Sequence, residues 1–196
     1  MPAIGLTDPR LGRVFAIAGS AILILLFALY GISYLTCVLF GLPFSLGLPL
    51  VVRLIGGVLV AVGLAVATSV FAYRSPSDVA VSTYLTLTKL AGRAPLAEPS
   101  GRTEPLVIDG PQKYVRNPLY SAVEVMLFGW AFVADSTSVL VFAVALLLWY
   151  ALVLIPFEER ELRALFGEQF ERYAEEVPML APFTKRKKRP TQPTLE

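Results

Sequence analysis

Long stretches without a charged residue are the feature that most limits how this chain can fold. Val14 to Phe40 and Leu54 to Tyr73 contain no charged side chain. A helix of about 20 apolar residues spans the hydrocarbon core of a bilayer, so each stretch predicts a transmembrane helix. Arg10 and Arg13 precede the first stretch, but it is longer than the apolar part of a signal peptide and has no obvious cleavage site.

Two more apolar stretches occupy residues 119–134 and 138–157. Only residues 135–137 separate them, so they predict a tight antiparallel hairpin. Apolar residues make up 56% of the whole chain, above the roughly 45–50% of a soluble domain. The sequence therefore predicts an all-α integral membrane protein with about four transmembrane helices.

The pattern of apolar residues changes after Phe157. Glu and Arg side chains fill one face, and apolar side chains recur on the other at helical spacing: Leu162, Leu165, Phe166, Phe170, Tyr173 and Val177. This pattern predicts an amphipathic helix that lies at the membrane surface and ends at Pro178.

Residues 74–105 are harder to interpret. Ser77 and Asp78 suit the start of a short helix through Leu90, whereas the alternation of Leu85 and Leu87 would also suit a strand. Several Gly and Pro residues predict a loop over residues 92–105.

Positive charge is distributed asymmetrically along the chain. Four spans return both termini to one side, and of the seventeen Lys and Arg residues only Arg53 then falls on the other side. Cytoplasmic segments carry the excess of Lys and Arg, so we expect both termini to be cytoplasmic. The basic run at residues 185–189 reinforces this topology and can hold anionic lipid headgroups. Nucleic-acid binding is not expected, because no folded basic surface accompanies the run.

Two absences in the composition exclude whole classes of chemistry. The chain has no histidine, which removes Ser-His-Asp and Cys-His catalysis, HExxH metal sites and histidine proton relays. Cys37 is the only cysteine, so neither an intrachain disulfide nor a CxxC redox or zinc site can form.

The segment Arg116-Asn117-Pro118-Leu119-Tyr120 begins the third apolar stretch. Proline suits the first turn of a helix, where its missing N–H would have no partner anyway. Arg116 is expected at the depth of the lipid headgroups, and Tyr120 on the same helix face as Glu124. From spacing alone, a functional motif and an Arg/Tyr anchor at the membrane surface are equally good interpretations.

Three carboxylates lie at positions where a negative charge is unfavourable for the stability of a membrane protein. Glu158 and Glu159 repel each other at the negative end of a membrane helix, which indicates a cationic partner such as a ligand ammonium or Arg116. The alternative is that they open the amphipathic helix. Glu124 lies inside a lipid-spanning stretch, where acids are usually functional. The alternative is that it is protonated or reaches Arg116.

Several short motifs follow one another in a distinctive order: Gly110-Pro111, residues 114–120, the apolar hairpin, Glu158-Glu159, Phe166-Gly167, Tyr173 and Val177-Pro178. Together they resemble the isoprenylcysteine carboxyl methyltransferase family and the related phospholipid methyltransferases. The resemblance covers about residues 106–183. It suggests three parts: an N-terminal membrane region (1–105), a methyltransferase-like core (106–183) and a basic tail (184–196).

The resemblance implies an integral membrane enzyme that uses S-adenosylmethionine. We expect it in the inner membrane of a prokaryote, with a cytoplasm-facing active site, where it would methylate a small lipophilic or lipid-borne acceptor. The family's cofactor-binding positions correspond to Tyr114, Arg116, Asn117, Tyr120, Glu158 and Glu159. Arg116 and Glu124 are the candidate catalytic residues. Such a methyl transfer needs no metal, because positioning and electrostatics can carry it.

Two other functions fit the same scaffold. Sterol-reductase-like proteins look similar in this region but bind NADPH, and the pair Glu158-Glu159 argues against them because they lack it. A membrane adaptor without catalysis is the second alternative. It is left open by Asn117, where the family often has His, and by Met179, where the family commonly has Arg.

Overall fold

The computed structural model describes residues 10–92 and 106–182, and within these ranges every regular element is a helix. The elements are α1 (Arg10–Leu39), α2 (Leu50–Phe71), α3 (Pro76–Leu90), the 3-10 turn η1 (Gly110–Lys113), α4 (Pro118–Val133), α5 (Thr137–Trp149), the π-helical segment η2 (Tyr150–Leu154), α6 (Ile155–Phe166) and α7 (Glu168–Glu176). The predicted basic tail and most of the predicted loop at 92–105 lie outside the described residues.

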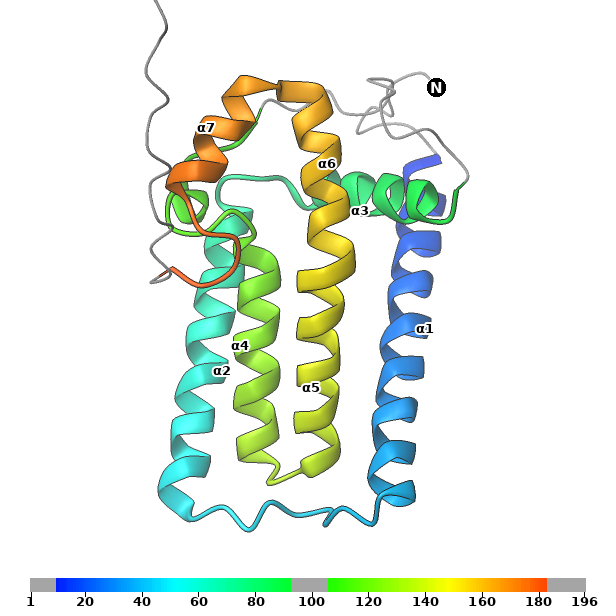
Figure 1. The fold of residues 1–196 in the computed structure, drawn as a ribbon, viewed down its shortest axis with the longest axis vertical. Helices are drawn as coiled ribbons and strands as arrows, with labels where there is room; N and C mark the ends of the chain where they lie inside the picture. Colours follow the sequence, from blue (N-terminus) through cyan, green and yellow to red (C-terminus); the bar gives the residue numbers. More distant parts are fainter. Residues whose placement is uncertain (1–9, 93–105, 183–196) are drawn as a thin grey trace, which may run out of the picture.

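Four long helices stand side by side, in the order α2, α4, α5 and α1 across Figure 1. Three segments are long and apolar enough to cross a membrane: Ile22–Leu39, Leu50–Phe71 and Thr137–Phe166. The fourth, Pro118–Val133, is apolar but shorter. The chain is an all-α integral membrane protein, which confirms the predicted fold class.

Glycine brings α2 and α4 into close contact along their length. A Cβ atom built on Gly56 would lie 2.7 Å from the Gly129 carbonyl oxygen, and one on Gly129 would lie 2.6 Å from that of Gly56. One on Gly63 would lie 2.7 Å from the Ala122 carbonyl oxygen. Small residues allow membrane helices to pack backbone against backbone. This contact fixes where the first turn of α4, with Tyr120, and the preceding Arg116 lie relative to the end of α2.

Asp135 joins the two loops at the end of the bundle far from α3 and α7. Its carboxylate accepts hydrogen bonds from the Ser45 hydroxyl (2.5 Å) and the Leu48 amide (3.0 Å), and its backbone is left-handed, with φ of 52°. The Ser45 bond is the main cause that lowers the pKa of Asp135 below its usual value. On the same side, Arg53 donates to the Val133 carbonyl oxygen.

The last helices differ from the prediction in where they divide. The sequence placed a boundary at Glu158, but the helix that begins at Thr137 runs through η2 and α6 to Phe166. The change from apolar to polar residues alters the surroundings of the helix without breaking its backbone. The break comes at Gly167, whose φ of 51° is unfavourable for residues with a side chain. The single amphipathic helix predicted up to Pro178 is therefore two, α6 and α7.

Helix α3 lies across the end of the bundle, beside α1 and α6 (Figure 1). The sequence left helix and strand open here, and the structure forms a helix. Lys89 on α3 makes an ion pair with Glu161 on α6, and both side chains are almost fully buried. Thr86, one turn earlier, donates to Glu158 at 3.2 Å. Two polar contacts thus hold α3 against α6.

Candidate functional site

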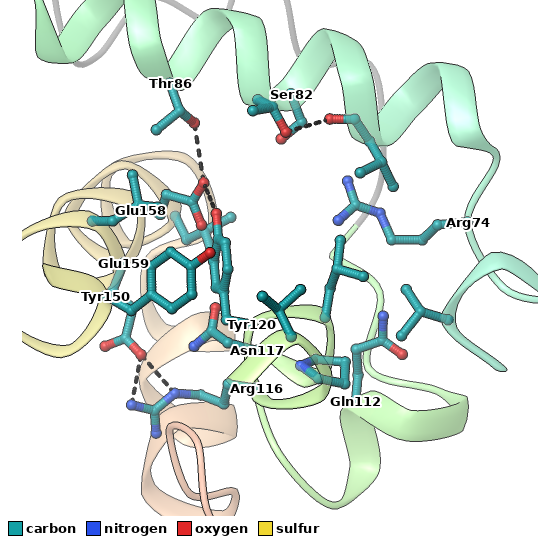
Figure 2. A pocket seen from close by; sticks show the side chains of 18 of the residues that line it. Arg74, Ser82, Thr86, Gln112, Arg116, Asn117, Tyr120, Tyr150, Glu158 and Glu159 are labelled. Carbon is teal, nitrogen blue, oxygen red and sulfur yellow. Dashed lines mark hydrogen bonds and ion pairs between the residues drawn. The ribbon is translucent and has the colours of Figure 1, made fainter. Parts of the chain in front are cut away.

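A cavity of about 350 Å³ opens at the end of the bundle where α3, α6 and α7 gather (Figure 2). Its size lies within the range of small-molecule pockets. Apolar side chains from all seven α-helices line it, among them Ile22, Leu25 and Leu26 of α1 and Leu146 and Trp149 of α5. Polar side chains also line it, and they include Arg74, Thr86, Gln112, Arg116, Asn117, Tyr120, Tyr150, Glu158, Glu159 and Tyr173.

Glu158 lines the cavity, and residues of two other helices, α3 and α4, form hydrogen bonds with its carboxylate. The Tyr120 hydroxyl donates to its Oε1 at 3.0 Å, and the Thr86 hydroxyl donates to the same atom at 3.2 Å. The Tyr120 ring also packs on Tyr150, with ring centres 4.7 Å apart. Residues from α3, α4 and α6 therefore meet at this one carboxylate, and two of them, Tyr120 and Glu158, were predicted from the sequence.

Glu159 makes a buried ion pair with Arg116. The Arg116 Nη2 atom lies 2.6 Å from Glu159 Oε1, and the two side chains are only 6% and 8% exposed. Arg116 Nη1 donates to the carbonyl oxygens of Ala174 (2.7 Å) and Val177 (2.6 Å). The pair therefore fastens the start of α4 to α6 and to the end of α7, while also forming part of the cavity wall.

Asn117 holds the chain segment that follows α7. Its side-chain amide donates to the Met179 carbonyl oxygen at 3.2 Å, and its backbone N–H donates to the same oxygen. The Arg116 N–H donates to the Pro178 carbonyl, and the Ser121 hydroxyl donates to that of Leu180. Asn117 lines the cavity, but its amide hydrogen bond points to a structural contribution.

Tyr114 is placed away from the other candidates. It is 70% exposed and does not line the cavity. Tyr173, in the second turn of α7, lies at the cavity instead. It donates to the Gln112 carbonyl oxygen at 2.8 Å, which ties α7 to η1. Burial is the main cause that raises the pKa of Tyr173 to about 12, so the phenol stays protonated and donates at neutral pH.

Glu124 is buried in the bundle, with 5% of its surface exposed. Neither carboxylate oxygen has a hydrogen-bond partner among the described residues. The alternative of a pair with Arg116 is wrong, because Arg116 pairs with Glu159. Glu124 is one turn beyond Tyr120 on α4 and does not itself line the cavity.

Several polar cavity residues were not predicted as site residues, among them Arg74, Thr86, Gln112 and Tyr150. Arg74, Gln112 and Tyr150 belong to no motif recognised in the sequence, and Thr86 belongs to a segment with no clear pattern. No local signal in the sequence indicates that these residues meet.

Comparisons with known proteins agree with this architecture. Residues 51–169 match the family model for phospholipid methyltransferases. Over 75 residues the chain is 43% identical to a methanethiol S-methyltransferase from Crocosphaera subtropica. That alignment covers 38% of this chain and 28% of the relative, so it spans about a quarter of that protein. No solved structure matches the chain. The family match covers more than half of the chain, from the start of α2 into α7, and the chain belongs to the phospholipid methyltransferase family.

Proposed function

We propose that this protein is a membrane methyltransferase that binds S-adenosylmethionine in the cavity between α3, α4 and α6 and methylates a lipophilic acceptor. The observation that carries the proposal is one cavity that combines a carboxylate, Glu158, held by Tyr120 and Thr86, with a largely apolar lining. A charged, water-soluble cofactor and an apolar acceptor need polar and apolar groups close together. Family membership supports the same reaction.

The chemistry of the cavity suits this cofactor. S-adenosylmethionine, when bound, supplies a methyl group on a positively charged sulfonium. Glu158 offers a carboxylate to cationic groups, and the rings of Tyr120 and Tyr150 offer aromatic faces, which attract cations. Gln112 is buried, and its Oε1 has no hydrogen-bond partner among the described residues. Buried polar atoms normally find partners, so this one suits a ligand group.

The protein contributes mainly by positioning. Holding two reactants in the correct geometry is worth up to about 7–11 kcal/mol of a reaction barrier in ideal cases. Arg116 and Glu159 serve as positioning residues here, because their ion pair fixes α4 against α6 and so sets the distance between Tyr120 and Glu158. Of the two candidate catalytic residues named from the sequence, Arg116 is therefore proposed to act through Glu159.

Glu124 is proposed to serve the acceptor. It is buried, it has no hydrogen-bond partner in the described part of the chain, and it is one turn beyond Tyr120 on the helix. Glu124→Gln should then leave thermal stability and cofactor affinity unchanged and lower the rate of methyl transfer. A Glu124→Leu protein as stable and as active as the parent would show that the carboxylate has no such role.

The apolar wall of the cavity favours an acceptor that arrives from the lipid. The relative's name makes a small thiol the first acceptor class to test, alongside carboxylate and amine lipids. The end of the bundle that holds the cavity is proposed to face the cytoplasm of a prokaryotic inner membrane, with both termini on that side. Labelling of a cysteine introduced at Ser45, which is exposed on the opposite end, from outside intact cells tests that orientation.

Binding of S-adenosylmethionine to the purified full-length protein is the deciding experiment. Isothermal titration in detergent should give saturable binding, and transfer of a radiolabelled methyl group to an added alkyl thiol should follow. Glu158→Gln should weaken binding, whereas Arg172→Gln should not, since the Arg172 side chain is 77% exposed on α7. A parent protein that binds NADPH but not S-adenosylmethionine would support the oxidoreductase alternative, and one that binds neither would support the adaptor.

A further inference from the structure

Gln112 brings a buried amide to the lining of the cavity. The residue is 5% exposed, yet its Oε1 has no hydrogen-bond partner within residues 10–92 and 106–182. Leaving such an atom unpaired costs stability, so buried acceptors normally have a donor. A donor on a bound ligand is the partner that this oxygen lacks.

The backbone around Gln112 is held from two sides. Gly110, with a φ of 64°, packs so closely on Tyr73 that a Cβ there would lie 2.5 Å from the ring. On the other side, the Tyr173 hydroxyl donates to the Gln112 carbonyl oxygen at 2.8 Å. These contacts fix η1 between the end of α2 and α7. The amide is therefore positioned before a ligand arrives, which lowers the entropy cost of binding.

Aromatic rings of α6 and α7 line the same cavity, from Phe166, Phe170 and Tyr173. The Phe170 and Tyr173 rings lie edge to face, with their centres 6.2 Å apart. Since Tyr173 is hydrogen-bonded to Gln112, these two rings border the amide. Ligand pockets commonly combine aromatic surfaces with a few polar groups that fix orientation. This part of the cavity suits a flat ring that carries polar groups on one edge.

Glu158 lies on the opposite side of the cavity from Gln112 (Figure 2). The ammonium group of S-adenosylmethionine is charged and gains most from a carboxylate, which assigns it to the side of Glu158. The adenine ring then lies on the side of Gln112. Its edge places an amino donor next to a ring-nitrogen acceptor. A side-chain amide matches both through two parallel hydrogen bonds, as glutamine does with adenine in DNA.

We propose that Gln112 recognises the adenine ring of S-adenosylmethionine, with Oε1 accepting from the amino group and Nε2 donating to the neighbouring ring nitrogen. The inference rests on the proposed function and adds to it a residue that selects the base. A ribose hydroxyl would engage only one of the two polar atoms of the amide, whereas the adenine edge engages both.

The test compares two ligands that differ only at the amino group: S-adenosylhomocysteine and its 6-deamino analogue, in which purine replaces adenine. Titration calorimetry of the full-length parent in detergent should show that the analogue binds about 5- to 150-fold more weakly, because it leaves Oε1 without a donor. Gln112→Leu should bind the two ligands equally, or the analogue more tightly, because leucine offers the amino group no acceptor. Lys113→Gln is the matched control on the same turn and should keep the parent's preference, since the Lys113 side chain is 62% exposed and does not line the cavity.

Two outcomes overturn the inference and leave the proposed function standing. The first is a parent protein that binds both ligands equally. The second is a Gln112→Leu protein that binds both more weakly by the same factor, since a purely structural role predicts that result. Gln112→Met, which is unbranched and similar in length to glutamine, gives the same comparison if the leucine variant does not fold. If the parent binds neither these ligands nor S-adenosylmethionine, the proposed function fails and the inference fails with it.

Discussion

Replacing Glu158 and Glu159 by glutamine, one at a time, should give two different kinds of defect. The residues are adjacent in the sequence, but Glu158 accepts hydrogen bonds from Tyr120 and Thr86 at the cavity, whereas Glu159 forms a buried pair with Arg116. The two substitutions are chemically identical and differ only in what each side chain contacts. Each is therefore the control for the other.

Glu159→Gln should mainly reduce stability. It leaves the Arg116 guanidinium, with 6% of its side chain exposed, without its counter-charge. Removing one partner of a buried ion pair costs about 3–5 kcal/mol, which corresponds to a fall in melting temperature on the order of 10 °C for a protein of this size. Arg116→Met should cost at least as much, because it also removes the hydrogen bonds to Ala174 and Val177.

Glu158→Gln should mainly reduce cofactor affinity. Glutamine keeps an oxygen that can accept from Tyr120 and Thr86, so we expect a loss of stability of no more than about 1 kcal/mol. Losing the charge should weaken S-adenosylmethionine binding by about 1.5–3 kcal/mol, or roughly 10- to 150-fold. Thermal denaturation monitored by tryptophan fluorescence in detergent, and titration calorimetry below the melting transition, measure the two effects separately. The reasoning is refuted if Glu159→Gln melts like the parent but loses cofactor affinity, or if Glu158→Gln binds like the parent.

Three other substitutions test separate parts of the fold. Gly129→Val should destabilise the protein by about 1–3 kcal/mol in thermal denaturation, because its Cβ would lie 2.6 Å from the backbone of α2, whereas Gly57→Ala should be neutral, since nothing lies within 4 Å there. Lys89→Met leaves the buried carboxylate of Glu161 without its ion-pair partner and should lower the free energy of unfolding by about 3–5 kcal/mol. Adding Glu161→Gln to this variant should restore much of that stability, because no buried charge then remains unpaired. The folded protein lowers the pKa of Asp135, so the ionised carboxylate of Asp135 stabilises the fold. This contribution to folding stability is complete above the unfolded-state pKa of about 3.9, and it is lost as the pH falls through the lower folded-state pKa. The difference in melting temperature between the parent and Asp135→Asn should therefore be constant from neutral pH down to about pH 5 and should disappear in strong acid; a difference that grows on acidification would contradict this.

The membrane helices could be predicted from the sequence because a single physical requirement determines them. An uncharged run such as Leu54 to Tyr73 has to satisfy its backbone hydrogen bonds internally in lipid, and a helix does so. The prediction was less accurate at Gly167, because one glycine in an amphipathic pattern does not by itself indicate a break. Only the packing of α7 against η1, seen in the bond from Tyr173 to Gln112, shows why the chain turns there.

The site was predicted in part. Tyr120, Glu158 and Glu159 were identified from their motifs and do lie together. The sequence did not separate the roles of the two glutamates, because successive residues of a helix point about 100° apart and only the surrounding helices decide what each meets. Arg74 and Thr86 could not be predicted at all. Thr86 reaches the cavity because α3 folds across the end of the bundle, and that contact depends on the distant residue Glu161. Arg74 lines the cavity from the turn that follows α2.

The π-helical segment Tyr150–Leu154 has a consequence for how this chain tolerates insertions and deletions. A π-helical turn contains about one residue more than an α-helical turn. Deleting one residue from it would restore an uninterrupted α-helix from Thr137 to Phe166 and leave the residues after it close to their present orientation, because the wide turn already takes up the extra residue. Glu159 would then stay near Arg116, and Glu158 near Tyr120. A one-residue deletion here should thus be tolerated better than one in the middle of α4, which has no π turn and where the deletion would rotate Tyr120 by about 100° relative to the contact with α2.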